Sequence, residues 1–173
     1  MKYAHILSYV ADTPWAILPS KMEELLSVLS FRAAGGTFSA EEIAARIGEG
    51  VDAPASSRQG AIAVIPLRGC IAHRMGTMEE SSGGMSVERF SRMYRAAVAD
   101  PNIGSIILDV DSPGGTVPGC HEVAQELLAL RGQKRTVAIA NTLMASAAYW
   151  IGCCADEVVA TPSARVGSIG VFS

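Results

Sequence analysis

The stretch IILDVDSPGG, Ile106–Gly115, is the strongest indication of fold class in this chain. Its first half is a short apolar run typical of a buried strand, and its second half is a turn built on proline and glycine. Similar apolar runs recur along the chain and alternate with helical segments. This alternation predicts βαβ units, which form a mainly parallel sheet covered by helices on both faces. We therefore predict an α/β fold.

Helix start signals outside this stretch agree with the same class. Ser20 and Ser86 are predicted N-caps, and Ser39 with Glu42 has the spacing of a capping box. The predicted strands are 61–67, 103–110, 136–140 and 158–160. The predicted helices are 21–31, a short one ending at Ile47, 87–99, 118–130, and one that begins just after Ser146.

Local composition divides the chain into three parts. Residues 1–50 carry two predicted helices and the irregular segment 14–19, and we interpret them as a small helical N-terminal appendage. Residues 51–60 are polar and are predicted to be a linker. Residues 61–173 hold all the predicted strands and form the predicted α/β domain, which includes a glycine- and methionine-rich loop over residues 74–86.

The overall composition excludes several classes of protein. Of the 173 residues, 49% are hydrophobic and 18% are charged, and the mean hydropathy is +0.27, which indicates a globular protein. A net charge of −3 argues against a nucleic-acid partner. No stretch reaches the roughly 18 consecutive apolar residues of a membrane span. We predict no membrane contact and no secretion.

Cysteines and carboxylates do not form a metal site in this sequence. The four cysteines lack ligand spacing, so we predict free thiols in a reducing compartment: Cys70, Cys120, Cys153 and Cys154. Asp109 and Asp111 lie on the same side of a predicted strand, but no third ligand has a supporting spacing. We predict neither a metal nor a cofactor.

Ser146 is the candidate nucleophile because it stands where a predicted strand passes into a helix. An acyl-transfer site also needs N–H donors for the developing oxyanion. Gly114 and Gly115 offer such donors, since glycine adopts backbone conformations closed to other residues and lets a substrate approach closely. A further donor is the N–H of Ala147 or that of Ser146 itself. Ser146 is thus the predicted catalytic residue, and Gly114, Gly115 and Ala147 the predicted oxyanion hole.

Three motifs carry a family resemblance. In chain order they are Ile106–Gly115, MASAAYWI (Met144–Ile151) and VGSIGV (Val166–Val171), and together they resemble the signal peptide peptidase A family of serine proteases, peptidase family S49. The resemblance implies a ClpP/crotonase-like fold of repeated βαβ units. It also implies a Ser–Lys dyad in which Ser146 is the nucleophile and Gly114 belongs to the oxyanion turn.

The element PWAI, Pro14–Ile17, resembles the phage branch of this family, the head maturation (prohead) proteases. That branch implies protein or peptide substrates, namely phage scaffold, portal or capsid proteins. It also implies a homo-oligomer in the cytoplasm of the bacterial host, associated with the phage prohead.

The general base is the part of the dyad that these residues do not supply. The lysine implied by the resemblance falls beyond Ser173, whereas the sequence contains three lysines: Lys2, Lys21 and Lys134. Lys134 precedes the strand whose far end carries Ser146, about 20 Å away, so we expect it not to be the base. We interpret His121 as a helix-surface residue rather than a base. We expect the chain to be truncated before its catalytic lysine and residues 1–173 alone to be inactive.

Two other hypotheses stay open. A crotonase-type acyl-CoA enzyme shares the oxyanion-hole architecture, but it requires paired carboxylates, which the sequence does not place near Ser146. An inactive or truncated module with a structural role in capsid assembly fits the absence of the lysine from the expected region.

Overall fold

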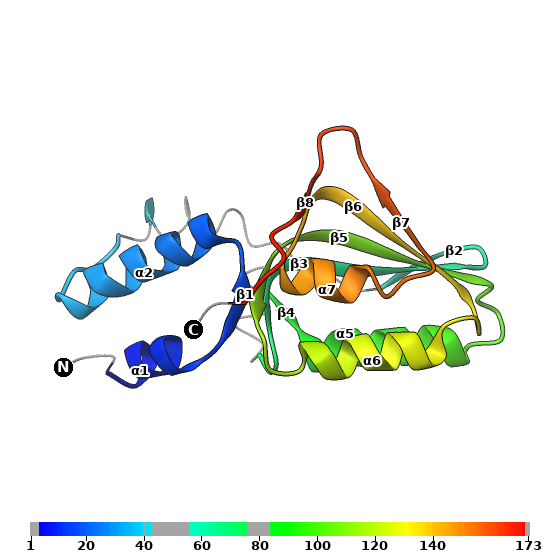
Figure 1. The fold of residues 1–173 in the computed structure, drawn as a ribbon, viewed down its shortest axis with the longest axis horizontal. Coiled ribbons are helices and arrows are strands. Elements are labelled where there is room, and N and C mark those ends of the chain that lie inside the picture. The colour runs from blue at the N-terminus through cyan, green and yellow to red at the C-terminus, as the bar shows by residue number, and fades with distance from the viewer. Residues whose placement is uncertain (1–3, 40, 43–55, 76–83, 172–173) are drawn as a thin grey trace.

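The computed structural model of the protein describes residues 4–39, 41–42, 56–75 and 84–171. It is a mixed α/β structure with one sheet, whose main strands follow the order β2-β3-β5-β6-β7 (Figure 1). Four strands run parallel: β3 (Ile62–Ala72), β5 (Ser105–Thr116), β6 (Arg135–Ala145) and β7 (Glu157–Ala160). The α/β class predicted from the alternation of strands and helices is confirmed.

Four short strands extend this sheet at its edges and ends. β1 (Trp15–Ile17) pairs antiparallel with β5, and β2 (Ser57–Gln59) pairs antiparallel with β3. β4 (Met85–Ser86) pairs parallel with β3, and β8 (Arg165–Gly167) pairs parallel with β6. None of them was among the predicted strands. β1 lies in the segment predicted to be irregular, β2 in the predicted linker and β4 in the predicted loop, and β8 follows the last predicted strand.

The helices of the domain share one core with one face of the sheet. These helices are α5 (Val87–Ala99), α6 (Cys120–Leu130) and α7 (Ala147–Gly152). Along β5 the fully buried residues are Ile106, Leu108 and Val110, whereas the residues between them are half-buried. The alternation means that the described helices cover one face, not the two faces expected from the apolar character of the strands.

Local capping explains where several helices begin. The Ser86 Oγ accepts a hydrogen bond from the Arg89 N–H at 3.4 Å, as predicted for the start of α5. Ser39 and Glu42 form both bonds of the predicted capping box, at 2.8 and 3.1 Å. The helix α2 (Pro19–Ala33) is capped by Leu18 rather than by the predicted Ser20. Proline suits the first turn of a helix because its missing N–H needs no partner there.

The N-terminal helices lie beyond the ends of the sheet strands. α1 (Ala4–Asp12) and α2 occupy the left side of Figure 1, and β1 joins them to the sheet. None of the helices in the described ranges is long and apolar enough to cross a membrane. The short helix predicted to end at Ile47 is described only at residues 41–42, and most of the loop predicted over 74–86 lies outside the described residues.

Candidate active site

Ser146 occupies a strained turn between β6 and α7. Its φ and ψ are 56° and −115°, and its exposed fraction is 5%. A positive φ is unusual for a residue that carries a side chain, and such strain persists only where neighbouring structure enforces it. The Ser146 N–H donates to the Gly167 carbonyl at 2.8 Å, and the Ser146 carbonyl accepts from the Trp150 N–H at 2.8 Å. The backbone of Ser146 is therefore held from both sides.

The segment after β8 also reaches the side chain of Ser146. The hydroxyl donates to the Gly170 carbonyl at 3.4 Å, a long hydrogen bond that is easily exchanged for another acceptor. Together with Gly167, this places the motif VGSIGV directly against the MASAAYWI motif. The sequence did not predict a contact between the motif VGSIGV and Ser146. The contact is made by backbone carbonyls, which every residue type carries.

Gly114 is the residue of β5 that faces this turn. Its φ is 95°, and a Cβ built on it would lie 2.3 Å from the Ala16 carbonyl oxygen. The same Cβ would lie 3.0 Å from the Ala147 nitrogen and 3.0 Å from the Ala145 carbonyl oxygen. Only glycine fits here, so the structure brings the glycine turn and the Ser146 turn into direct contact.

The predicted oxyanion donors differ in their availability. The Ser146 N–H is used by Gly167, so of the two alternatives at this turn Ala147 is the remaining donor. Ala147 is the first residue of α7, where N–H groups have no partner within the helix. The Gly114 N–H donates to the Ser112 hydroxyl at 3.2 Å, and that hydroxyl donates to the Gly69 carbonyl at 2.6 Å.

Gly115 has a different environment from Gly114. Its φ is not positive, and a Cβ built on it would lie 1.8 Å from the Ile71 carbonyl oxygen of β3. Its missing side chain therefore lets the β3 backbone pack closely against β5. We keep Gly115 as a predicted oxyanion residue, but its contacts are those of a packing position.

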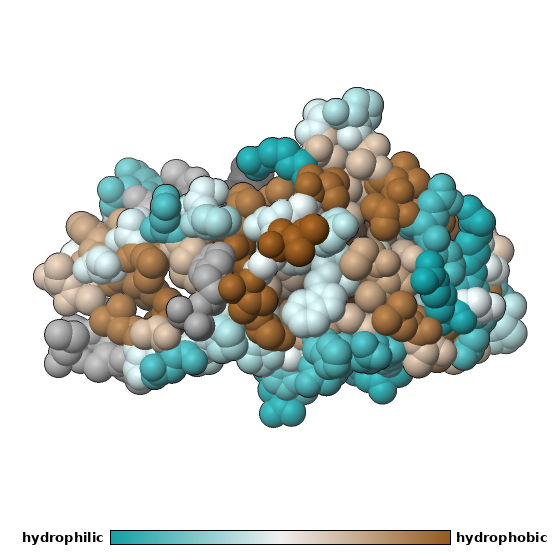
Figure 2. All heavy atoms as spheres, in the orientation of Figure 1, coloured by the Kyte–Doolittle hydropathy of each residue, from teal (hydrophilic) through white to brown (hydrophobic). Residues whose placement is uncertain are grey.

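An apolar cavity of about 280 Å³ adjoins Ser146. Its lining comes from four parts of the chain: β1, the Ser146 turn, α7 and the segment after β8. In Figure 2 brown, apolar atoms gather in this middle region of the visible face, near β1 and the C-terminal segment. The lining residues are Ala16, Ser146, Tyr149, Trp150, Cys153, Ile169, Gly170 and Val171.

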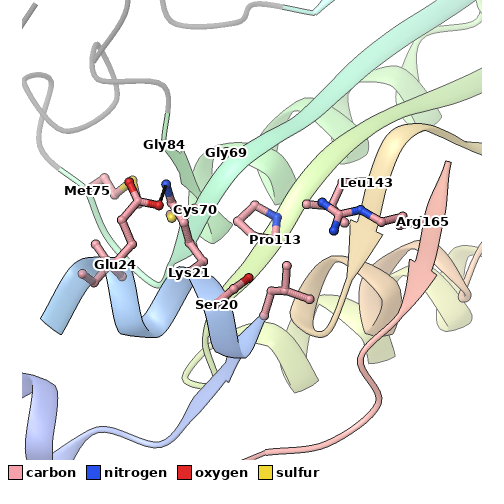
Figure 3. A pocket seen from close by; sticks show the side chains of 12 residues that line it. Ser20, Lys21, Glu24, Gly69, Cys70, Met75, Gly84, Pro113, Leu143 and Arg165 are labelled. Carbon is pink, nitrogen blue, oxygen red and sulfur yellow. Dashed lines mark hydrogen bonds and ion pairs between the residues drawn. The ribbon is translucent and has the colours of Figure 1, made fainter. Parts of the chain in front are cut away.

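The two described lysines are engaged elsewhere. Lys21 forms an ion pair with Glu24 at 2.7 Å, inside a larger cavity of about 790 Å³ that Cys70 and Arg165 also line (Figure 3). The Lys134 Nζ donates to the carbonyls of Ala97 and Asp100 at the end of α5. This agrees with the expectation that Lys134 is not a base for Ser146.

His121 does not serve the nucleophile either. Its ring lies on α6 against Trp150, with 6.0 Å between the ring centroids. Within the described part of the chain, no hydrogen bond joins the Ser146 hydroxyl to a lysine or a histidine. The base of the predicted dyad therefore stays a prediction.

The other polar candidates of the sequence are satisfied by local partners. Asp109 pairs with Arg68, and Asp111 accepts a hydrogen bond from Thr142. No group of three metal-ligating side chains occurs among the described residues.

Three of the four thiols do not compete as nucleophiles. Burial raises the pKa of Cys120 to about 12 and that of Cys154 to about 11. Burial also raises the pKa of Cys70. A thiol acts as a nucleophile only as the thiolate, so these three groups stay protonated and unreactive near neutral pH.

Residues 129–173, which include Ser146 and the segment after β8, match the model of peptidase family S49. Over these residues the chain is similar to peptidase family S49. The family resemblance read from the three motifs is thereby confirmed.

Individual proteins share a longer stretch with this chain. The head-tail preconnector protein GP5 of Enterobacteria phage P21 is 36% identical over 64% of this chain and 22% of its own length. Protease 4 of Salmonella typhi is 37% identical over 65% of this chain and 18% of its own. Capsid assembly protease C of Escherichia phage lambda is 33% identical over 64% of this chain and 25% of its own. The chain thus spans a quarter or less of the length of these relatives.

Proposed function

We propose that this chain carries the nucleophile and the oxyanion hole of a serine endopeptidase of the S49 type. The observation that carries the proposal is the meeting of Ser146, Gly114 and the Ala147 N–H where β5 and β6 end. The family match over residues 129–173 supports it, because that match includes Ser146. The ClpP/crotonase-like fold is part of the same proposal.

In the proposed reaction, the Ser146 Oγ attacks the scissile carbonyl carbon of an extended peptide and its proton passes to a general base. The carbonyl oxygen gains negative charge and accepts hydrogen bonds from the Gly114 and Ala147 N–H groups. Gly114 exchanges the Ser112 hydroxyl for this oxyanion, which is favourable because a charged acceptor makes the stronger bond. The protonated base then delivers its proton to the leaving amine, and water hydrolyses the acyl-enzyme.

The proposed general base is a lysine beyond Ser173, as the family resemblance implies. A lysine amine accepts a proton near neutral pH only when burial or a nearby cation lowers its pKa. The Ser146 hydroxyl is itself well placed to turn toward such an amine, because its present bond to Gly170 is long.

The proposed substrates are phage scaffold, portal or capsid proteins, cut by a homo-oligomer in the host cytoplasm on the phage prohead. Two relatives support this choice, since their names refer to capsid assembly and to the head-tail preconnector. Protease 4 shows that similar chains also occur outside phages.

The test uses the full-length protein and a fluorophosphonate, which labels activated serines covalently. We expect labelling of Ser146 in the parent protein and in the Ser163→Ala control, whose serine is exposed between β7 and β8. Ser146→Ala should lose the label, and cleavage of co-expressed capsid proteins should fall by more than about 10³-fold. Undiminished cleavage by Ser146→Ala would remove Ser146 from the mechanism.

A second candidate is a non-enzymatic module of capsid assembly. The observation that favours it is that no lysine or histidine of the described residues hydrogen-bonds the Ser146 hydroxyl. This candidate predicts that the full-length protein co-sediments with proheads equally well with and without Ser146→Ala, and that no serine is labelled.

A further inference from the structure

β1 lies on the edge of β5 that is nearest to the nucleophile. Its residues Trp15–Ile17 pair antiparallel with Thr116–Gly114. Two backbone hydrogen bonds flank the paired residues: the Leu18 N–H donates to the Pro113 carbonyl at 2.8 Å, and the Val117 N–H donates to the Pro14 carbonyl at 3.1 Å. β1 therefore occupies the backbone of β5 from Pro113 to Val117.

This edge is available to β1 only because β6 leaves β5 at the Ser146 turn. The last pair between β5 and β6 is Ser112 with Met144, after which β6 runs on to Ser146. The opposite edge of β5 stays paired with β3 as far as Gly115. Without β1, the backbone of β5 facing Ser146 would be an unpaired strand edge.

An unpaired edge next to a nucleophile is where an extended peptide binds by strand addition. The peptide carbonyl attacked by Ser146 has to lie between Ser146 and Gly114 to reach the proposed oxyanion donors. In this structure the Ala16 carbonyl oxygen lies against Gly114, and Ala16 also lines the cavity next to Ser146. β1 and a peptide paired with these residues would use the same backbone groups of β5, so only one of them binds at a time.

We propose that β1 is a built-in competitor of the peptide substrate and that a peptide pairs with Gly114–Thr116 only when β1 has left this edge. The inference rests on the proposed peptidase function. Its regulatory consequence is that the N-terminal appendage lowers the affinity of the site for peptides until an event releases it. β1 suits this role because it is only three residues long and its indole N–H at Trp15 bonds to the Val10 carbonyl of α1, not to the domain.

A matched pair of variants at Leu18 tests the competition. Leu18 has φ −60° and ψ 127°, which proline adopts, but the proline ring carbon would replace the N–H that approaches the Pro113 carbonyl at 2.8 Å, so Leu18→Pro removes this hydrogen bond and pushes β1 away from β5. Leu18→Ala removes the same side chain but keeps the N–H. Loss of one such hydrogen bond shifts the equilibrium between docked and undocked β1 by about fivefold.

The readout is the binding of a fluorescein-labelled TPWAILP peptide, the sequence of Thr13–Pro19, to full-length protein that also carries Ser146→Ala. Fluorescence anisotropy should show about fivefold tighter binding to the Leu18→Pro protein than to the Leu18→Ala protein. Equal or weaker binding to Leu18→Pro would overturn the proposal, because β1 would then be a fixed part of the site that does not compete with peptides. Thermal melts of both variants confirm that each is folded.

A reversible disulfide between β1 and β5 tests the same point by holding β1 in place. Trp15 and Thr116 are directly opposite in an antiparallel pair, at a separation suited to a disulfide, so Trp15→Cys with Thr116→Cys joins β1 to β5 under oxidation. Oxidation should weaken peptide binding at least about tenfold relative to the same protein after reduction, and the single variant Thr116→Cys should show no such change. Unchanged binding by the oxidised protein, or failure of the disulfide to form, would overturn the proposal.

The proposed function is tested separately by its own probe. A fluorophosphonate is small and needs no strand pairing, so it reports on Ser146 whether or not a peptide binds. Absence of labelling together with a redox-dependent change in peptide binding would reject Ser146 as a nucleophile while supporting the competition. Labelling of Ser146 together with unchanged peptide binding after oxidation would support Ser146 as a nucleophile and reject the competition between β1 and peptides.

Discussion

The end of β5 lies between two neighbours that hold it in different ways. On one side β3 pairs with it in parallel from Ile62 to Ile71, and both strands contribute to the main core. On the other side β1 pairs with it over three residues and belongs to a segment whose helices lie beyond the sheet. The first contact builds the domain, whereas the second covers the candidate site.

Two adjacent glycines show the same difference at atomic scale. Gly115 faces β3, where an added Cβ would lie 1.8 Å from a carbonyl oxygen. Gly114 faces β1 and the Ser146 turn, and it alone of the two has a positive φ. A glycine pair that looks uniform in the sequence therefore divides into a packing residue and a site residue. Five substitutions, in four experiments, test that division.

Gly115→Ala should have the largest effect. The three atoms nearest to its Cβ all belong to the Ile71 backbone, and backbone cannot move aside as a flexible side chain does. We expect the free energy of unfolding to fall by at least about 3 kcal/mol, measured by urea denaturation. Gly104→Ala is the control, because its nearest atom is 3.8 Å away and its φ is not positive. Equal stability of the two variants would contradict the close approach of β3.

Ile71→Ala and Ile17→Ala compare the two neighbours directly, since both side chains are almost fully buried. Ile71→Ala should lower the free energy of unfolding by about 3 kcal/mol. Ile17→Ala should cost only about 1 kcal/mol, because an element that undocks by itself limits the loss to its own docking free energy. Equal losses of unfolding free energy in urea denaturation would show that β1 is as firmly part of the folded core as β3.

Gly114→Ala should disturb the site more than the fold. Alanine at this φ costs about 1–2 kcal/mol, and its Cβ would push against the Ala16 carbonyl oxygen. Labelling of Ser146 by the fluorophosphonate should fall at least about tenfold, because the oxyanion donor moves. The control is Gly132→Ala, which has a φ of 84° but no atom within 4 Å. Normal labelling of the Gly114 variant would remove Gly114 from the oxyanion hole.

Ser112→Ala should have the smallest effect. It removes the hydroxyl that bridges the Gly114 N–H and the Gly69 carbonyl, so the free energy of unfolding should fall by about 1 kcal/mol. Labelling of Ser146 should proceed at least as fast as in the parent, because the Gly114 N–H is released for the oxyanion. A loss of labelling would instead assign Ser112 a positioning role.

Local signals in the sequence were sufficient for the framework. The α/β class, the Ser86 cap and the Ser39–Glu42 capping box follow from periodicity and from partners a few residues apart, and the structure agrees with them. The family resemblance followed in the same way, because its motifs are contiguous and the match over residues 129–173 includes two of them in full. The general base and the division into appendage, linker and α/β domain stay predictions.

Contacts between distant segments of the chain could be known only from the folded structure. The sequence offered the N–H groups of both Ser146 and Ala147 as donors, and the bond from Ser146 to the Gly167 carbonyl distinguishes them. The PWAI segment was predicted to be irregular because the four residues between Pro14 and Pro19 have too little periodicity to indicate a strand. Its pairing with β5 depends on an edge that exists only after β6 turns away at Ser146, and such an edge is a property of the folded sheet, not of any local stretch of residues.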